Sequence, residues 1–304
     1  MNQSFKIVIA QELDLLPEQE RRIKALGETT IYHDFARNED EWFERVKVAD
    51  FICSGKFGLK KKIYDLKDVV LSLPFVGVGW IDKNKIKERN ITVTYCPGCN
   101  KHAVSEWVIG NMINLFRNMM HLNKIKDMTT RQNVRTLGLY HKKICILGKG
   151  NIGKKVGKIS KSLGMNVEYF TRGDNLKEKT KNSDVVINCL SLNQTTKNLL
   201  NKDFFDSLKR NSFFITVTSK NIYDTDAMLD ALEKGVLAGI ATDCAHINVG
   251  NAQDEYYKQM IDNPKIIATP HIASRTDVTD KIANDMMIDN IENYIKGNPI
   301  NILE

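Results

Sequence analysis

The sequence feature that most constrains the fold is the run 143–153, in which an apolar segment is followed by three spaced glycines. The first glycine of such a run allows a tight turn, the second lets the backbone approach a pyrophosphate, and the third lets a helix pack closely on the strand. The strand before and the helix after distinguish it from an ordinary glycine turn. The run therefore predicts a dinucleotide site that includes Gly148, Gly150, Asn151, Ile152 and Gly153.

The rest of the chain alternates short apolar segments with helical segments. Before the glycine run, strands are predicted at 6–10, 28–32, 50–53, 69–76 and 91–95, with a helix at 17–26. After it, strands are predicted at 165–170, 184–190, 212–217, 237–243 and 265–269, which with the first make six. Such alternation indicates parallel sheets with helices on their faces. We therefore predict an α/β fold in which a doubly wound Rossmann sheet accompanies a second, smaller α/β domain.

Two longer helices are predicted outside these strands. The helix at 103–123 has a broad apolar stripe rich in methionine and aromatic residues, which core packing, burial between two domains or a dimer interface would explain. We predict a homodimer that uses this helix. The last helix is expected to be capped by Thr276 and to stop at Gly297, and such a helix often crosses back to the first domain.

Composition limits the function classes. A length of 304 residues suits two domains, and no apolar run reaches membrane-spanning length. The first residues lack a signal-peptide pattern, so a cytoplasmic location is expected. The formal charge of +7 comes from lysines scattered along the chain, which favours a solvated surface over a nucleic-acid site. We expect neither nucleic acid nor a membrane as a partner.

The cysteines predict no special chemistry. Cys53, Cys145, Cys189 and Cys244 lie in or beside apolar strand-like runs, where buried thiols are common. The pair Cys96 and Cys99 forms a CxxC, which could be a redox pair or half of a zinc site. Because no second ligand pair accompanies it, loop residues and no metal site are predicted.

Several short motifs occur together and in order. They are Gly77-Val78-Gly79, Cys96-Pro97-Gly98-Cys99-Asn100 with Val104-Ser105-Glu106, the glycine run, Leu192-Asn193-Gln194-Thr195-Thr196, and Thr269-Pro270-His271-Ile272-Ala273. Together they resemble the D-isomer-specific 2-hydroxyacid dehydrogenases over nearly the whole chain. The resemblance implies a flavodoxin-like substrate domain of 1–99 and 276–304, an inserted Rossmann domain of 100–275, an active site between them, and dimers.

The resemblance also implies a reaction and its catalytic residues. Such enzymes move a hydride between a nicotinamide and a 2-keto or 2-hydroxy acid, with an arginine, a histidine and a glutamate in the polar roles. His271 matches the histidine, whose ordinary pKa suits a general acid. Ser219 stands in place of the arginine and Asn248 in place of the glutamate, which removes both charges. Lys220 and His246 are close enough in sequence to compensate.

Further residues are expected at the substrate and the cofactor. The backbone N–H groups of Val78 and Gly79 are expected to receive a substrate carboxylate, because amides in a glycine turn can form an anion nest. The resemblance places the remaining cofactor contacts at Leu190, Ser191, Thr196, Val217, Thr218, Asp243, His271 and Ala273.

The choice of cofactor depends on the end of the strand at 165–170. An NAD site usually has an acid there to hold the ribose 2′-OH, but Thr171 occupies the position. Arg172 beside it suits a 2′-phosphate. We therefore predict NADP(H) in preference to NAD(H), with Asp174 as the residue that would favour NAD(H).

Two function classes remain after these observations. The first is an NAD(P)-dependent oxidoreductase acting on a small carboxylic acid. The alternative is a cofactor-binding sensor or regulator of the same fold with little or no turnover. An enzyme requires a cation or a polarising donor near the substrate carbonyl, whereas a sensor does not. Because Ser219 supplies no cation, we predict weak turnover of ordinary 2-keto acids.

Overall fold

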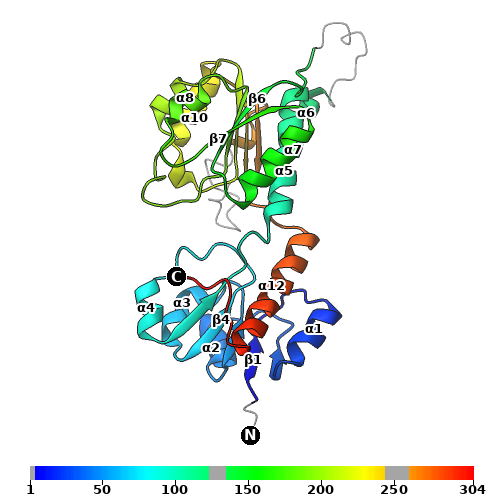
Figure 1. Ribbon diagram of the computed structural model, residues 1–304, viewed down its shortest axis with the longest axis vertical. Helices are drawn as coiled ribbons and strands as arrows, with labels where there is room; N and C mark the ends of the chain where they lie inside the picture. The colour runs from blue at the N-terminus through cyan, green and yellow to red at the C-terminus, as the bar shows by residue number, and fades with distance from the viewer. Residues whose placement is uncertain (1–3, 123–134, 244–259) are drawn as a thin grey trace. The chain divides into compact units, whose positions relative to one another are not determined.

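The computed structural model describes residues 4–122, 135–243 and 260–304 of the chain. These residues divide into two compact units, Met1–Asn100 with Arg275–Glu304 (unit 1) and Lys101–Ser274 (unit 2). Each unit contains a parallel sheet with helices on its faces (Figure 1). The predicted α/β fold is therefore confirmed.

Unit 1 has a five-stranded parallel sheet with the order β2-β1-β3-β4-β5. This is the strand order of flavodoxin-like sheets. The predicted strand at 69–76 ends earlier, at Ser72, since Pro74 has no N–H with which to continue the ladder. The strands are β1 (Lys6–Ile9), β2 (Glu28–Ile31), β3 (Phe51–Cys53), β4 (Val69–Ser72) and β5 (Ile91–Thr94).

Helices cover both faces of this sheet (Figure 1). Helices α1 (Pro17–Lys24) and α12 (Asp277–Ile295) pack on the face to which Ile7 and Ile9 point. Val8 points to the opposite face, as alternation along a strand requires. The elements on that opposite face are α2 (Glu39–Val46), α3 (Leu59–Lys62), the 3₁₀ turn η1 (Ile63–Asp65) and α4 (Lys83–Glu88).

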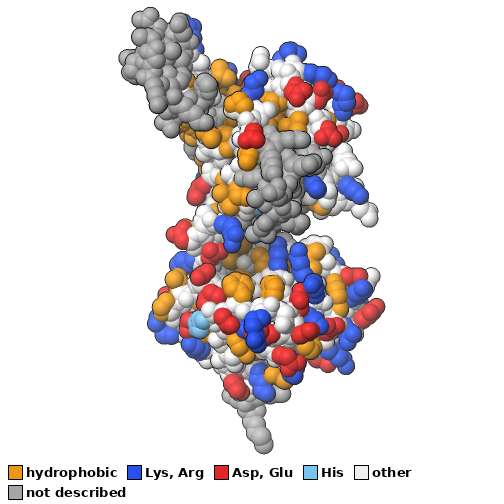
Figure 2. Space-filling model, turned by 180° about the vertical axis from the view of Figure 1, so that it is seen from behind, with side chains coloured by type: hydrophobic (Ala, Val, Ile, Leu, Met, Phe, Trp, Pro, Cys, Tyr) orange, Lys and Arg blue, Asp and Glu red, His pale blue; other side chains and the backbone are white. Residues whose placement is uncertain are grey.

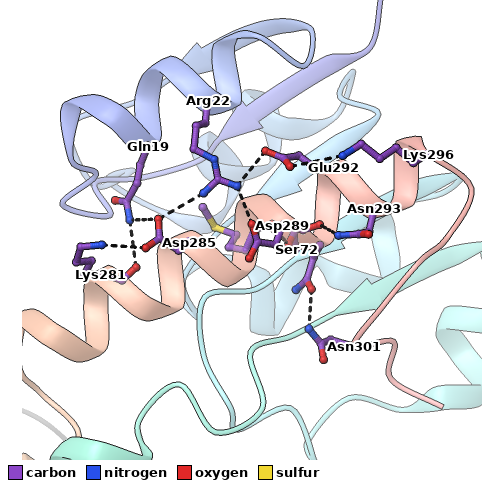
Figure 3. Close-up of polar contacts among 12 residues, drawn as sticks. Gln19, Arg22, Ser72, Lys281, Asp285, Asp289, Glu292, Asn293, Lys296 and Asn301 are labelled. Atoms are coloured by element: carbon purple, nitrogen blue, oxygen red, sulfur yellow. Dashed lines mark hydrogen bonds and ion pairs between the residues drawn. The ribbon is translucent and has the colours of Figure 1, made fainter.

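The C-terminal helix α12 is fixed in unit 1 by polar contacts as well as apolar packing (Figure 3). Arg22 of α1 pairs with three carboxylates of α12, Asp289 at 2.6 Å, Glu292 at 2.9 Å and Asp285 at 3.5 Å. At the end of β4, the Ser72 hydroxyl donates to the Met287 carbonyl at 2.8 Å. These contacts join α12 to α1 and to the end of β4.

The predicted ends of α12 are confirmed. The Thr276 hydroxyl accepts a hydrogen bond from the Thr279 N–H at 3.2 Å and caps the helix. Gly297 follows the end of the helix with a φ of +75°, a left-handed conformation that glycine adopts without strain.

Unit 2 has a six-stranded parallel sheet with the order β11-β10-β9-β8-β6-β7, so the six predicted strands are confirmed. The order reverses at β6, because β7 lies on one side of it and β8 on the other. Open sheets of this kind bind ligands outside the carboxyl ends of the strands at such a reversal. The strands are β6 (Lys143–Leu147), β7 (Asn166–Phe170), β8 (Val185–Asn188), β9 (Ser212–Thr216), β10 (Leu237–Asp243) and β11 (Ile266–Thr269).

Helices α5 (Lys101–Arg117) and α7 (Asn151–Ser162) cover one face of this sheet (Figure 1). The other face is covered by apolar side chains from the remaining segments of unit 2. These segments include α8 (Leu176–Thr180), α9 (Lys202–Asp206), the 3₁₀ turn η3 (Lys220–Ile222) and α10 (Thr225–Glu233).

The prediction of one continuous helix at 103–123 is wrong, because the structure has two helices there. Asn118 has a left-handed φ of +49°, which ends α5, and a short helix α6 (Met119–Leu122) follows. Met112 and Phe116 of the apolar stripe are buried in the core of unit 2 itself. Only the end of the stripe, at Met119, is exposed. Most of the stripe is therefore explained by packing within one unit.

No helix in the described parts of the chain is long and apolar enough to span a bilayer. On the face of unit 1 drawn in Figure 2, lysine and arginine side chains are interspersed with aspartate and glutamate.

Candidate functional site

The glycine turn after β6 is fixed by backbone contacts. Gly148 has a φ of +96°, and a Cβ on it would lie 3.1 Å from the Cys189 carbonyl oxygen. A Cβ on Gly153 would lie 2.1 Å from the Gly148 oxygen, so only glycine lets α7 approach the turn this closely. No atom of the described residues lies within 4 Å of the Cβ position on Gly150, the N-cap of α7. A tight turn with open space at the start of a helix fits a pyrophosphate.

A fourth glycine, which the sequence analysis missed, holds α7 against β7. A Cβ on Gly157 would lie 2.0 Å from the Tyr169 hydroxyl. Its four-residue spacing from Gly153 places both glycines on the same face of α7, which is the signal that could have found it. The same Tyr169 ring lies 5.2 Å from the Lys149 Nζ, so Lys149 adds a cation beside the glycine turn.

A cavity of about 440 Å³ opens at the carboxyl ends of β6, β7 and β8. Its position is the reversal of strand order, where open sheets bind nucleotides. Six of the predicted cofactor residues line it together, namely Gly148, Thr171, Arg172, Leu190, Ser191 and Thr196. Its other lining residues were not predicted, namely Lys149, Phe170, Gly173, Asn193, Thr195 and Leu199.

The carboxylate that could favour NAD(H) is already bonded at the end of β7. Asp174 Oδ2 accepts hydrogen bonds from the Thr171 N–H at 2.7 Å and from the Thr171 hydroxyl at 2.9 Å. These two bonds hold the pKa of Asp174 below its ordinary value. Arg172 lines the cavity, and its side chain forms no ion pair with any residue that the structure describes. At the end of β7, the Arg172 guanidinium therefore has no ion-pair partner in the described residues, whereas the Asp174 carboxylate already accepts two hydrogen bonds.

The loop after β8 is closed by its own polar side chains. Asn193 Oδ1 accepts from the N–H groups of Thr195 at 2.9 Å and Thr196 at 3.2 Å. The Thr196 hydroxyl donates to the Ser191 carbonyl at 2.7 Å. Residues 191–196 therefore form a defined wall of the cavity.

Asn188, which the sequence analysis also missed, ties two strand ends together. It is fully buried, and its Nδ2 donates to the hydroxyls of Thr216 at 3.2 Å and Thr218 at 2.8 Å. Its Oδ1 accepts from the Leu190 N–H at 3.2 Å. An amide at the end of an otherwise apolar strand could have indicated this role. Asn188 fixes the loops that follow β8 and β9.

Ser219, which the sequence analysis placed at the position of the family's arginine, caps a turn. Ser219 Oγ accepts from the Asn221 N–H at 3.3 Å at the start of η3. Lys220 is exposed and pairs with no acidic side chain in the described parts of the chain. Val217, which precedes them, is half-buried at the same strand end. The structure therefore has a neutral hydroxyl at this position and a cation without a fixed partner next to it.

Asp243, the buried last residue of β10, holds the loop that carries His271. Its Oδ1 accepts from the Thr269 hydroxyl at 2.6 Å and the Ile272 N–H at 2.9 Å, and its Oδ2 accepts from the Ala273 N–H at 2.9 Å. His271 is exposed and has a left-handed φ of +54°. Hydrogen bonds to a carboxylate are strong, so Asp243 fixes the Thr269 side chain before His271 and the backbone after it.

The glycine turn of unit 1, Gly77-Val78-Gly79, is more open than the glycine turn after β6. The Val78 N–H donates to the Val76 carbonyl at 3.0 Å, whereas the Gly79 N–H has no partner in the described residues. Neither Gly77 nor Gly79 has a positive φ, and among the residues that the structure describes no atom lies within 4 Å of the Cβ position on Gly79. Of the two N–H groups expected to receive a carboxylate, only that of Gly79 is unpaired.

The CxxC pair lies in the core of unit 1. Cys96 and Cys99 are free and buried, and the Cys96 thiol donates to the Ala283 carbonyl of α12 at 3.3 Å. Burial raises the pKa of both thiols, to about 11 for Cys99. Reactive cysteines have lowered pKa values, so this environment favours packing over redox chemistry.

The structure brings most of the predicted residues to one edge of one sheet. Because all neighbouring strands of unit 2 pair in parallel, the residues after β6, β7, β8, β9 and β11 share the carboxyl edge. Val78 and Gly79 belong to unit 1. Cys244, His246 and Asn248 lie outside the described residues, as does position 123.

The turn, the cavity and the strand order define a dinucleotide-binding protein of the doubly wound class. The profile of the family "D-isomer specific 2-hydroxyacid dehydrogenase, NAD binding domain" matches residues 109–273, more than half of the chain. The chain belongs to this family, and the resemblance in the motifs is thereby confirmed. Membership in the family associates the chain with the cofactor NAD or NADP without distinguishing them.

Curated relatives cover most of the chain. D-3-phosphoglycerate dehydrogenase of Haemophilus influenzae is 29% identical over 282 residues, which are 84% of this chain and 66% of that enzyme. The chain thus spans slightly less than two thirds of the length of that relative. Glycerate dehydrogenase of Methylorubrum extorquens is 25% identical over 294 residues, 90% of this chain and 92% of that enzyme.

Solved structures show the same fold. An acyclic imino acid reductase in complex with NADPH and D-arginine superimposes with a TM-score of 0.82 at 22% identity, covering 98% of this chain and 100% of that one. The NAD-complexed D-isomer specific 2-hydroxyacid dehydrogenase of Lactobacillus delbrueckii ssp. bulgaricus gives 0.79 at 20% identity, with coverages of 98% and 100%. At such identities the likeness concerns the fold alone.

Proposed function

We propose that the chain is an NAD(P)-dependent oxidoreductase that transfers a hydride between the nicotinamide and a small 2-oxo or 2-hydroxy acid. One observation carries the proposal. The carboxyl edge of the unit 2 sheet combines a turn and cavity that fit a dinucleotide with a buried carboxylate, Asp243, that fixes the loop of His271. Membership in the family supports the reaction type. In this proposal unit 2 binds the cofactor and unit 1 binds the substrate.

The chain's own residues have distinct roles in this proposal. When bound, the nicotinamide cofactor supplies or accepts the hydride. The first N–H groups of α7 bind the pyrophosphate, and the open space at Gly150 accommodates it. His271 exchanges a proton with the substrate oxygen, and Asp243 orients its loop.

The missing arginine predicts weak turnover of ordinary 2-oxo acids. Ser219 carries no charge to stabilise the developing negative charge on the carbonyl oxygen, and losing one such donor costs about 3 kcal/mol of transition-state stabilisation. Asn248 brings no charge to the position of the family's glutamate, so it does not raise the pKa of a neighbouring histidine as an acid would.

A combined substitution tests this explanation. Ser219→Arg with Asn248→Glu is expected to raise kcat/KM for 2-oxo acid reduction on the order of a hundredfold. Steady-state kinetics with pyruvate, glyoxylate and hydroxypyruvate would measure it. Ordinary turnover by the unmodified chain that His271→Ala leaves unchanged would contradict both the explanation and the role of His271.

NADP(H) is the proposed cofactor. The support is the Arg172 side chain at the cavity, which has no ion-pair partner in the part of the chain that the structure describes, together with the Lys149 cation at its rim. Asp174, the acid that could hold a ribose 2′-OH, is engaged by Thr171 instead. Titration with both reduced cofactors, followed by nicotinamide fluorescence, decides the question. Tighter binding of NADH than of NADPH would reject the proposal.

A cofactor-binding sensor of the same fold is the second candidate. The observation that favours it is the neutral cap at Ser219, because a sensor needs no cation at the substrate carbonyl. The two candidates are separated by recording the fluorescence of bound NADPH and adding a panel of 2-oxo acids. Loss of fluorescence with product formation indicates an enzyme, and stable fluorescence with every acid indicates a sensor.

A homodimer through the α5–α6 region is also proposed. The exposed side chains of Met119 and Met120 are each 55% accessible. Met120, Leu137 and Ile261 line a cavity of about 420 Å³ that is separate from the cofactor edge. Light scattering at micromolar concentration is expected to give a dimer mass, and Met119→Glu with Met120→Glu a monomer mass. A monomer mass for the unmodified chain would reject the proposal.

A further inference from the structure

Lys56 places a positive charge on the glycine turn of unit 1. Its Nζ lies 3.5 Å from the position that a Cβ on Gly77 would occupy. It also lies 5.1 Å from the centre of the Phe75 ring. The ammonium therefore lies beside the turn in which the Gly79 N–H has no partner among the described residues. A cation and an unpaired N–H next to open space are two groups that bind a carboxylate.

No acidic side chain neutralises Lys56 within the residues that the structure describes. Other lysines of the same short segment are paired, Lys61 with Glu39 and Lys62 with Asp40 at 2.8 Å. These pairs show that acids are available nearby and that lysines at the surface of this segment reach them. Lys56 and Lys60, the two lysines of this segment that approach the aromatic side chains beside the turn, have no such pair among the described residues.

The surroundings of Lys56 favour a bound anion. The side chain is exposed in part, but burial of the ammonium lowers its pKa and the charge of Lys60 lowers it further. Lys60 Nζ lies 5.9 Å from the centre of the Trp80 ring, and Trp80 Nε1 donates to the Gly77 carbonyl at 3.0 Å. Two lysines thus flank the turn, and an anion placed between them would offset their repulsion.

We propose that Lys56, together with the Gly79 N–H, binds the carboxylate of a small 2-oxo acid. This inference rests on the proposed function, in which the turn of unit 1 receives the substrate. It deepens that function because Ser219 leaves the arginine position without a charge. Lys56 acts on the carboxylate alone, so it contributes to substrate binding more than to the chemical step.

Binding of oxalate to the full, cofactor-free chain tests the proposal without any turnover. Oxalate is a small dianion that carries the carboxylate of a 2-oxo acid but cannot be reduced. Isothermal calorimetry is expected to show binding by the unmodified chain and a Kd about ten- to a hundredfold higher for Lys56→Ala. Equal affinities, or no oxalate binding by the unmodified chain, would overturn the proposal.

Two further variants separate a binding role from a folding role. Lys56→Arg keeps the charge and is expected to keep oxalate affinity within about threefold of the unmodified chain, since a guanidinium also binds carboxylates. Lys61→Ala removes a lysine of the same segment that is paired with Glu39, and it is expected to leave oxalate affinity unchanged. An equal loss in Lys61→Ala and Lys56→Ala would mean that general surface charge binds the anion, and would reject the proposal.

Kinetics then distinguish failure of this inference from failure of the proposed function. If 2-oxo acids are reduced, Lys56→Ala is expected to raise KM about tenfold or more with little change in kcat. If no acid is reduced with NADPH or NADH while oxalate binding still requires Lys56, the proposed reaction fails and the anion site stands. If acids are reduced and Lys56→Ala has an unchanged KM, the proposed reaction stands and the role of Lys56 fails.

Discussion

The two glycine turns of the molecule differ in what surrounds them. In unit 2, added Cβ atoms on Gly148 and Gly153 would meet backbone atoms, so these two positions of the turn require glycine, whereas Gly150 between them faces open space. In unit 1, Gly77 faces a lysine ammonium and Gly79 faces open space. Two of the three glycines in the unit 2 turn are therefore required by close backbone packing, whereas neither glycine of the unit 1 turn meets backbone atoms of the described residues. Glycine indicates close packing at Gly148 and Gly153, and accessibility in the unit 1 turn.

The polar groups near the two turns also differ, because two at the unit 2 edge are hydrogen-bonded within the protein, whereas two beside the unit 1 turn are not, among the described residues. At the unit 2 edge the side chains of Asn188 and Asp243 are bonded to neighbouring loops. Beside the unit 1 turn, the Gly79 N–H and the Lys56 ammonium have no partners in the described residues. A bonded edge is preorganised before its ligand arrives, which lowers the ordering cost of binding. An unpaired turn depends on the ligand to satisfy its groups.

The largest expected effect comes from breaking the steric limit in unit 2. Gly153→Val places a branched side chain where even a Cβ would lie 2.1 Å from the Gly148 oxygen, so α7 must move away from β6. We expect a loss of about 3 kcal/mol of unfolding free energy and loss of NADPH binding. Urea denaturation and fluorescence titration would measure the two effects.

The matched control is the corresponding change in unit 1. Gly79→Ala adds a Cβ with no atom within 4 Å, and the backbone there has no positive φ. The midpoint of urea denaturation is expected to stay unchanged. A stability loss in Gly79→Ala equal to that in Gly153→Val would remove the contrast between the turns.

The next largest effect concerns the bonded edge. Asp243→Asn keeps the size of the side chain but turns an acceptor oxygen into an NH₂ group that faces one of its N–H donors. A buried donor left unsatisfied costs about 2 kcal/mol, so the unfolding free energy and the His271-dependent rate are expected to fall while NADPH binding persists. Thermal melts and kinetics would be compared with Thr269→Ala, which removes one of the three bonds.

An opposite outcome for Asp243→Asn would be informative. If NADPH affinity fell sharply at unchanged stability, Asp243 would contact the cofactor itself and would not act through the loop. The three short hydrogen bonds to its carboxylate favour the loop.

The fold was predictable because its determinants are local. Alternating apolar strands and helices predicted both parallel sheets, and the spacing of Gly148, Gly150 and Gly153 predicted the turn and the helix after it. Each signal lies within a short window of sequence. The break at Asn118 was not predictable in this way, because the apolar stripe continues across it and the left-handed residue leaves no periodic trace.

Parts of the candidate site depend on contacts between distant segments. The Asp243 carboxylate bonds a loop that follows another strand, and Asn188 reaches Thr218 from a different strand end. Lys56 lies beside Gly77 because β3 and β4 are neighbours in the sheet. No spacing rule connects such residues, so the sequence offered only the residue types and not their partners.

A smaller effect, on the affinity for NADPH, is expected from Arg172 at the cavity of unit 2. Arg172→Ala removes the unpaired guanidinium at the cavity and is expected to raise the Kd for NADPH about tenfold, the value of one charge-assisted hydrogen bond. The Kd for NADH is expected to stay unchanged, because NADH lacks the 2′-phosphate. Equal changes for both cofactors would mean that Arg172 contacts a group that they share.

The smallest expected effect concerns Arg45, a paired cation of unit 1 that contrasts with Lys56. Arg45 is buried and binds Glu41 at 2.8 Å, and Arg37 binds the same carboxylate at 2.7 Å. The hydrogen bond from Arg37, with that from Arg45, lowers the pKa of Glu41 from 4.5 to about 2. When the pKa of a carboxyl group is lower in the folded than in the unfolded state, its charge stabilises the fold above the unfolded-state pKa. This stabilisation is lost as the pH falls toward the folded-state pKa.

Thermal melts of the unmodified chain and Glu41→Gln test this linkage. At pH 7 the variant is expected to melt slightly lower, and the difference is expected to shrink between pH 4.5 and about 2, where the carboxylate of the unmodified chain becomes protonated. The effect is small because Arg37 is exposed and solvent screens the pair. Glu44→Gln, on the same helix but paired with the exposed Lys47 and with no arginine in the described residues, should show no such convergence. A difference for Glu41→Gln that stays constant down to pH 2 would mean that its charge does not stabilise Arg45, and the contrast with Lys56 would lose its paired member.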